Sequence, residues 1–207
     1  LAMPHHDLVF TGSGTEALNM AINSVEGHII TSSMEHAAVL EACRTKDVTI
    51  LDPIDGKGSI SPEQVREAIR PNTKLIVLTA ANNETGVKTA IDEIAALGIP
   101  FLIDGVAALG KEEWKMPSGI CAVAFSAHKI HGPQGIGCLI FDKKFPLKPL
   151  IVGGSQQKGL RAGTENLAGI VGFAKAVELI DLGEMEALRD YFESKLEDVV
   201  IHGKDEE

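Results

Sequence analysis

The feature that most constrains the fold of this 207-residue sequence is the recurrence of short aliphatic runs bounded by turn residues. Short, mostly apolar runs of this kind are typical of strands that are buried on both faces of a sheet. The runs expected to form strands are residues 8–10, 28–31, 48–51, 75–78, 101–103, 122–125 and 137–141. The core is therefore expected to be aliphatic, in keeping with the 4% of aromatic residues.

Helical stretches lie between several of these runs. Residues 16–24, 35–43 and 61–69 are expected to be helices. The last of them opens with Ser61-Pro62-Glu63-Gln64, a capping box with proline at the first helical position. Strands that alternate with helices predict an α/β fold, a mainly parallel sheet covered by helices on both faces.

The C-terminal part differs from the rest. A long amphipathic stretch runs from residue 167 to about residue 200, with an interruption near Gly183, and its later apolar residues recur at helical spacing. Residues 1–182 are therefore expected to form one large domain, and residues 183–207 a helix that leads toward a small C-terminal domain. The sequence opens at Leu1 with a strand following closely, so we expect its start to lie partway into a fold.

Charge and composition exclude several classes of protein. The sequence holds 19 Lys and Arg against 29 Asp and Glu, a net charge of −10, which has the wrong sign for binding nucleic acid or an anionic membrane surface. Apolar runs such as residues 75–78 are far shorter than a bilayer span. The three cysteines are widely spaced, which fits neither a disulfide framework nor a CxxC metal site. A reducing compartment, the cytoplasm, is expected.

The segment richest in side chains that could take part in a reaction is residues 125–137. Lys129 follows a predicted buried strand, with the Ser126 hydroxyl three residues before it and the His128 imidazole directly before it. A lysine so placed can be desolvated and reactive while its neighbours hold an anion. On these grounds alone, a surface lysine in a glycine-rich loop explains the segment equally well.

Two other kinds of site are disfavoured. His128 and His131 have the spacing of metal ligands on one helical face, but no third ligand is evident and Lys129 between them favours phosphate, so we expect no metal. Gly12 and Gly14 could begin a dinucleotide-binding fingerprint, yet no acidic residue closes a following strand at the expected spacing.

Ser126-Ala-His-Lys129, followed by Gly132-Pro-Gln-Gly-Ile-Gly137, resembles the lysine motif of the class V aminotransferase family, which are pyridoxal 5′-phosphate (PLP) enzymes of fold type I. The resemblance implies that Lys129 carries PLP as a Schiff base. It also implies phosphate contacts from Ser126 and His128.

Five further segments resemble motifs of one branch of that family, the cysteine desulfurases. They are residues 10–16, 34–36, 82–86, 101–104 and 161–164, in the order that the family has them. The resemblance implies the following roles: Gly14 and Thr15 at the phosphate, His36 stacked on the pyridine ring, Asn83 reaching the cofactor, Asp104 at the pyridinium nitrogen, and Thr164 crossing a dimer interface to the neighbour's phosphate.

The chemistry of these residue types agrees with the roles. A carboxylate such as Asp104 favours the protonated pyridinium, which makes the ring an electron sink for a carbanion. Taken alone, Asp104 after a strand would more often cap a helix, and His36 would more often be a capping or partly buried histidine.

Two departures from the family stand out. Ala107 occupies the place of a glutamine that bonds the cofactor's phenolic oxygen. The catalytic cysteine and the arginine for the substrate carboxylate are expected beyond Glu207. Cys43 falls in a predicted helix, Cys121 before a strand and Cys138 inside one, so we expect all three to be small buried hydrophobes.

The resemblance implies a cysteine desulfurase that converts cysteine to alanine. His36 and Lys129 would shuttle protons, and a separate cysteine would take the sulfur as a persulfide for iron–sulfur cluster or related assembly. Expected partners are a second copy of the chain and a sulfur-acceptor or scaffold protein. One alternative is another class V aminotransferase or lyase. The other is a degenerate, non-catalytic scaffold homologue, to which Ala107 lends weight.

Overall fold

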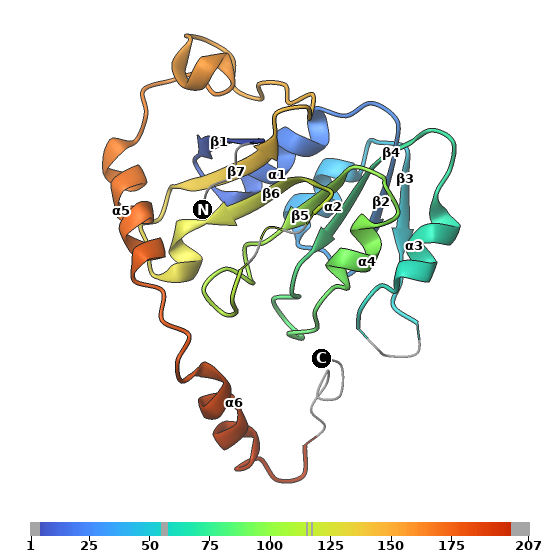
Figure 1. The fold of residues 1–207 in the computed structure, drawn as a ribbon, viewed down its shortest axis with the longest axis vertical. Helices are drawn as coiled ribbons and strands as arrows, with labels where there is room; N and C mark the ends of the chain where they lie inside the picture. The colour runs from blue at the N-terminus through green and yellow to red at the C-terminus, as the bar shows by residue number, and fades with distance from the viewer. Residues whose placement is uncertain (1–4, 55–57, 115, 117, 200–207) are drawn as a thin grey trace.

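The computed structural model describes residues 5–54, 58–114, 116 and 118–199, and in these residues one sheet holds all the strands (Figure 1). The strands are β1 (His6–Thr11), β2 (His28–Ser32), β3 (Val48–Leu51), β4 (Thr73–Thr79), β5 (Phe101–Asp104), β6 (Ile120–Ser126) and β7 (Gly137–Asp142). Their order is β1-β7-β6-β5-β4-β2-β3. Within this sheet, β7 is antiparallel to both of its neighbours, and the other strands run the same way.

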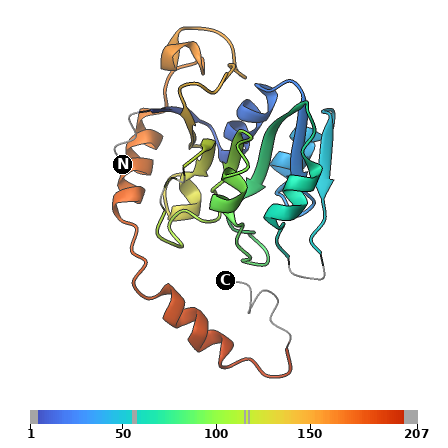
Figure 2. The same ribbon diagram turned by 45° about the vertical axis from the view of Figure 1, so that its right-hand side comes forward.

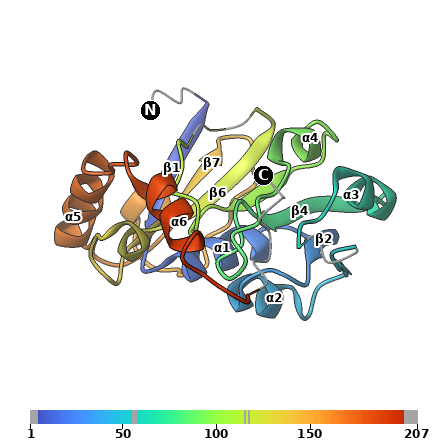
Figure 3. The same cartoon turned by 90° about the horizontal axis from the view of Figure 1, so that it is seen from below.

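Helices cover both faces of the sheet, as Figure 3 shows. One face packs on α1 (Gly14–Asn23) and α2 (Ala37–Cys43), and the other on α3 (Pro62–Ala68), α4 (Ile91–Ala95) and α5 (Leu167–Glu178). Strand β4 shows why: Leu75 and Val77 enter the first core, while Ile76 and Leu78 enter the second. A strand whose two faces are both apolar must be covered twice. The predicted α/β fold is confirmed.

The predicted helices are α1, α2 and α3, with ends shifted by one or two residues. The capping box is present: Gln64 N donates to Ser61 Oγ over 3.2 Å, and Ser61 N donates to Gln64 Oε1 over 3.0 Å. Helix α4 was not predicted. It has five residues and no side-chain cap, so it is too short to show a helical period.

The C-terminal stretch forms two separate helices. Phe173 and Ala176 hold α5 against the sheet, whereas α6 (Met185–Glu193) lies away from it and has no buried residue (Figures 1 and 2). The expected interruption near Gly183 is confirmed. The helix expected over residues 183–207 is shorter within the described residues, because the backbone leaves the helix after Glu193 and has a φ of 57° at Asp198.

The topology brings distant segments together at one edge. Strands β2, β4, β5 and β6 are parallel, so their carboxyl ends share that edge of the sheet. Asp104 is the last residue of β5, and the segments that follow β2, β4 and β6 carry His36, Asn83 and Lys129. In open α/β sheets, ligands bind in the crevice outside the carboxyl ends of the strands.

Candidate functional site

A cavity of about 240 Å³ lies at this edge, and it gathers every predicted site residue except Thr164. The predicted residues that line it are Gly14, Thr15, His36, Asn83, Asp104, Ser126, His128 and Lys129. They come from the start of α1, from the segments after β2 and β4, from the last residues of β5 and β6, and from the short 3₁₀ helix of Ala127–Ile130 that follows β6. Residues separated by more than a hundred positions therefore share one small volume.

The first wall of the cavity is the N-terminus of α1. Ser13 caps this helix by accepting a hydrogen bond from Glu16 N over 3.1 Å, which leaves the N–H groups of Gly14 and Thr15 without a partner among the described residues. A side chain at Gly14 would meet Val106 Cγ2 at 2.8 Å, so only glycine allows this close approach. Free N–H groups at the positive end of a helix suit an anion.

Two side chains from the end of β6 extend this anion site. Ser126 Oγ and His128 Nδ1 share a hydrogen bond of 2.9 Å and line the same cavity as Thr15. A hydroxyl, an imidazole and helix N–H groups are together the donors that a phosphate accepts from. The residues therefore fit the phosphate group of PLP.

Lys129 occupies the 3₁₀ helix directly after β6, and its side chain is exposed to the cavity. Within the described part of the chain its ammonium group has no hydrogen bond or ion pair at contact distance. Its main-chain carbonyl accepts a hydrogen bond from Lys111 Nζ over 3.2 Å. The chain is thus held at Lys129 by its backbone, while the amine stays available for a covalent partner.

Asp104 ends β5 with only 5% of its surface exposed. Its Oδ1 accepts a hydrogen bond from Val106 N over 3.0 Å, and the described residues supply no other donor to the carboxylate. Burial raises the pKa of Asp104, against the lowering effects of the Val106 N–H and of the charges on His36 and Lys129. A buried carboxylate with spare acceptor capacity fits a ring N–H⁺ such as a pyridinium.

His36 is the N-cap of α2. Its Nδ1 accepts a hydrogen bond from Ala38 N over 3.0 Å, so the neutral ring carries its proton on Nε2. His36 therefore caps the helix with its side chain, and its exposed ring also lines the cavity. His36 can cap α2 and also act in the cavity, because the cap uses only Nδ1 and leaves Nε2 available for another partner.

Thr164 lies outside the cavity, on an exposed segment between the 3₁₀ helix of Gln156–Gly159 and α5. The same segment is tied to the turn that precedes α1: Arg161 Nε and Glu16 Oε1 form an ion pair of 3.0 Å, and Gly12 N donates to Glu16 Oε2 over 2.7 Å. The side chains of this pair are only 24% and 15% exposed. The role of Thr164 across a dimer interface stays a prediction.

The three cysteines are free and buried. Cys121 lies within β6 rather than before a strand, a correction that follows from the pairing of β6 with β5, which extends the strand back to Ile120. Burial raises the pKa of Cys43 to about 11 and the pKa of Cys121 and Cys138 to about 12. At neutral pH all three are protonated thiols, which are poor nucleophiles.

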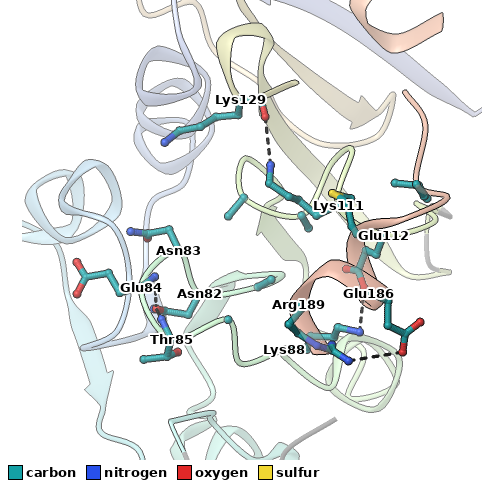
Figure 4. Close-up of a pocket in the computed structure, with 16 residues that line it drawn as sticks. Asn82, Asn83, Glu84, Thr85, Lys88, Lys111, Glu112, Lys129, Glu186 and Arg189 are labelled. Carbon is teal, nitrogen blue, oxygen red and sulfur yellow. Dashed lines mark hydrogen bonds and ion pairs between the residues drawn. The ribbon is translucent and has the colours of Figure 1, made fainter. Parts of the chain in front are cut away.

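Ala107 lines the site cavity and also a larger neighbouring cavity of about 900 Å³ (Figure 4). Asn83 and Lys129 line both cavities as well. The larger one extends to Met185 and Arg189 on α6. The small side chain at position 107 thus lies where the two spaces meet.

Three residues near the site were missed by the sequence analysis. Ser13 could have been found, because Ser13-x-x-Glu16 is a capping pattern. Asn82 and Glu35 gave no signal, since the burial of both side chains and the bond from Asn82 to the Met34 carbonyl depend on the fold. Burial raises the pKa of Glu35 to about 7; its Oε1 accepts a hydrogen bond from Ser32 Oγ over 2.7 Å, and its buried Oε2 has no partner among the described residues.

The described residues hold neither a metal-binding cluster nor a membrane-spanning helix. No cluster of three or more His, Cys, Asp or Glu side chains there could hold a metal ion. Nor does any helix in the described ranges combine the length and apolar character needed to cross a bilayer.

Solved structures with similar folds cover most of this chain. A structure titled "SspA in complex with cysteine" matches with a TM-score of 0.83 and 38% identity, over 94% of this chain and 60% of that chain. A NifS-like protein from Rickettsia africae matches with a TM-score of 0.88 and 29% identity, over 97% of this chain and 61% of that chain. The fold is that of PLP fold type I cysteine desulfurases.

Curated relatives and a family model agree with the structural matches. The protein named cysteine desulfurase IscS of Dictyoglomus turgidum is 38% identical over 95% of this chain and 57% of its own length. A cysteine desulfurase of Cereibacter sphaeroides is 42% identical over 90% of this chain and 53% of its own length. The chain thus spans about half the length of these relatives. The model of the family "Aminotransferase class-V" matches residues 1–201, and the chain belongs to that family.

Proposed function

We propose that this chain is the PLP-binding portion of a cysteine desulfurase. The observation that carries the proposal is the convergence of three groups on one cavity of about 240 Å³. These are the Lys129 amine, the buried Asp104 carboxylate and the capped N-terminus of α1. PLP has an aldehyde, a pyridine nitrogen and a phosphate. The Lys129 amine suits the aldehyde, the Asp104 carboxylate suits the pyridine nitrogen, and the N-terminus of α1 suits the phosphate.

When bound, PLP supplies an electron sink for the carbon next to the substrate amine. Lys129 Nζ would hold the cofactor, and its free amine would act as a base in the cavity. Asp104 holds the ring-nitrogen proton in a site of low dielectric. His36 donates from Nε2, because its Nδ1 is held by Ala38 N. Thr15, Ser126 and His128 bind the phosphate, while Asn83 orients the ring.

Cysteine is the proposed substrate, with alanine as product. The names of the relatives support this, as does the structural neighbour titled as a complex with cysteine. Because the thiols of Cys43, Cys121 and Cys138 are buried and protonated, the sulfur is taken by a thiol other than these. We expect this chain to bind PLP but not to release sulfide.

The remaining assignments belong to the same proposal. Residues 1–182 form the PLP-binding domain and residues 183–207 lead toward a small domain, which the break between α5 and α6 supports. The protein acts as a homodimer in which Thr164 reaches the neighbour's phosphate. Sulfur passes to an acceptor or scaffold protein for iron–sulfur cluster assembly, and the compartment is the cytoplasm.

A second function, transamination or another PLP reaction that needs no thiolate, is favoured by one observation. The chain has three cysteines and each is buried with a raised pKa. Chemistry that uses only Lys129, His36 and Asp104 remains open to such a chain.

The first experiment measures cofactor attachment. The purified chain is supplied with PLP, reduced with borohydride and digested, and the modified peptide is identified by mass spectrometry. We expect the adduct at Lys129, and its loss in Lys129→Ala but not in Lys175→Ala, a control on the exposed surface of α5. An adduct of equal stoichiometry in Lys129→Ala would overturn the assignment.

The second experiment separates the two functions. Sulfide release from cysteine and deuterium exchange at the substrate α-carbon are measured for the chain and for the full-length gene product. Sulfide from the full-length product alone supports the desulfurase. Sulfide from the chain itself, abolished by substitution of one of its cysteines, would contradict the burial argument. Exchange and transamination without sulfide from either protein would favour the second function.

A further inference from the structure

Asn82 follows β4 by three residues, and its side chain forms the hydrogen bonds that close two loops. Only 6% of its surface is exposed. Its Oδ1 accepts hydrogen bonds from Glu84 N and Thr85 N, both over 2.9 Å, and its Nδ2 donates to the carbonyl of Met34 over 2.8 Å. Figure 4 shows Asn82 beside Glu84 and Thr85. One side chain thus contacts segments that are 48 positions apart.

The backbone of Asn82 is also fully engaged. Its N–H donates to Val87 O over 2.9 Å, and its carbonyl accepts from Gly86 N over 2.9 Å. Gly86 has a φ of 76°, which closes the turn and favours glycine. The segment 82–87 is therefore wrapped around Asn82 rather than held by contacts of its own exposed side chains.

The two loops joined by Asn82 each carry a residue of the site cavity. Asn83 is its neighbour in the first loop, and His36 lies two residues after Met34 in the second. Asn82 itself does not line that cavity, although it lines the larger one beside it. The hydrogen bond from Asn82 to the Met34 carbonyl therefore ties the loop that carries Asn83 to the segment that carries His36.

We infer that Asn82 is a positioning residue that holds His36 and Asn83 in one arrangement at the site. The inference rests on the proposed function for its chemical consequence, but the arrangement itself exists in the chain without cofactor. A positional error of about 1 Å can cost around a hundredfold in rate. Loss of one neutral hydrogen bond lowers the population of the closed loop by roughly fivefold to tenfold.

Two variants divide the contacts of Asn82. Asn82→Asp keeps an acceptor for Glu84 N and Thr85 N but loses the donor to the Met34 carbonyl, so it frees only the His36 loop. Asn82→Ala removes all three side-chain bonds and frees both loops. Glu84→Ala is the matched control, because it alters an exposed side chain of the same loop and leaves every bond of Asn82 in place.

The first readout uses the chain without PLP. Amide hydrogen exchange at Glu84 and Thr85 should accelerate at least fivefold in Asn82→Ala and stay near the wild-type rate in Asn82→Asp and Glu84→Ala. The ring resonances of His36 in NMR spectra should shift in both Asn82 variants and not in the control. If Asn82→Ala does not fold, the test rests on Asn82→Asp. Unchanged His36 resonances in that variant would overturn the inference.

The second readout uses the chain with PLP. The rate constant for α-deuterium exchange should fall tenfold or more in Asn82→Asp, with the KM for the amino acid within about twofold of wild type, because the substitution removes no residue that lines the site cavity. A wild-type rate constant in both Asn82 variants would overturn the inference. A wild-type chain that binds no PLP would refute the proposed function instead, and the cofactor-free exchange data would still test the positioning role.

Discussion

The edge of the sheet that carries the cavity and the C-terminal part of the chain differ in how far their side chains are buried. At the edge, Asp104 and Asn82 are 5% and 6% exposed, and their polar contacts are made within this chain. On α6, Leu188 and Phe192 are 60% and 64% exposed although they recur at helical spacing. Residues of the first region are buried by contacts within the chain, whereas α6 has no buried residue and its large apolar side chains remain mostly exposed.

This difference in burial predicts which substitutions should change the stability or activity of the isolated chain. A side chain whose partners lie in the same chain gives its full effect on the isolated chain, because its environment is already complete. An exposed side chain gives an effect only when another surface covers it. The following predictions test this contrast between the cavity edge and the C-terminal part, from the largest expected effect to the smallest.

Asp104→Asn should lower the rate of α-deuterium exchange by about 10²- to 10³-fold, the usual consequence of losing one preorganised electrostatic group at a reacting centre. An amide cannot hold the ring nitrogen in its protonated form as a carboxylate does. PLP should still attach to Lys129, which the borohydride adduct checks. A variant that keeps the wild-type exchange rate would show that Asp104 does not contact the ring.

Glu35→Gln should change the dependence of stability on pH. The pKa of Glu35 is raised from 4.5 to about 7 by burial, so the folded state holds a proton that the unfolded state has lost between these values. Its contribution to stability is therefore complete below about pH 4.5 and is lost as the pH rises to 7, by at most about 3 kcal/mol.

Urea unfolding at pH 5 and pH 8 measures this effect. The wild type should lose more stability than Glu35→Gln between the two values, and the exposed control Glu84→Gln should follow the wild type. Parallel losses in Glu35→Gln and the wild type would contradict the raised pKa.

Ser126→Ala should weaken PLP binding by tenfold or more, since a hydrogen bond to a charged group contributes roughly 1.5 to 3 kcal/mol. Its contact is made within the chain, so the loss should be the same at every protein concentration. Thr164→Ala should weaken binding only at concentrations where the chain forms dimers. Equilibrium titration with PLP, combined with sedimentation, distinguishes the two. Equal losses in a monomer would place Thr164 in its own chain's site.

The double variant Leu188→Ala, Phe192→Ala should change the stability of this chain by no more than about 0.5 kcal/mol, because both side chains are exposed. The buried Phe173 of α5 gives the matched comparison: Phe173→Ala should cost roughly 3 to 5 kcal/mol. Denaturant unfolding measures both. A large loss from the α6 variant would mean that α6 packs against the sheet domain in solution.

Much of this protein could be predicted from local sequence. The two-faced apolar pattern of β4 predicts a doubly covered sheet, and Ser61 and Gln64 mark the start of α3. The run from Ser126 to Lys129 pointed to a candidate lysine, but its expected role came from the resemblance to the family. These signals are local because strand periodicity, capping and turn formation depend on residues within about four positions of each other. Other site residues, His36 and Asp104 among them, were found only by their resemblance to family motifs.

The tertiary structure decided what depends on distant partners. Residues after β2, β4, β5 and β6 line one cavity because parallel strands place their carboxyl ends at the same edge. Glu35 has a raised pKa because the fold buries it, and Asn82 joins two loops because it meets Met34 across 48 positions. Burial and long-range hydrogen bonds are properties of the packed chain, so a sequence carries no local pattern for them.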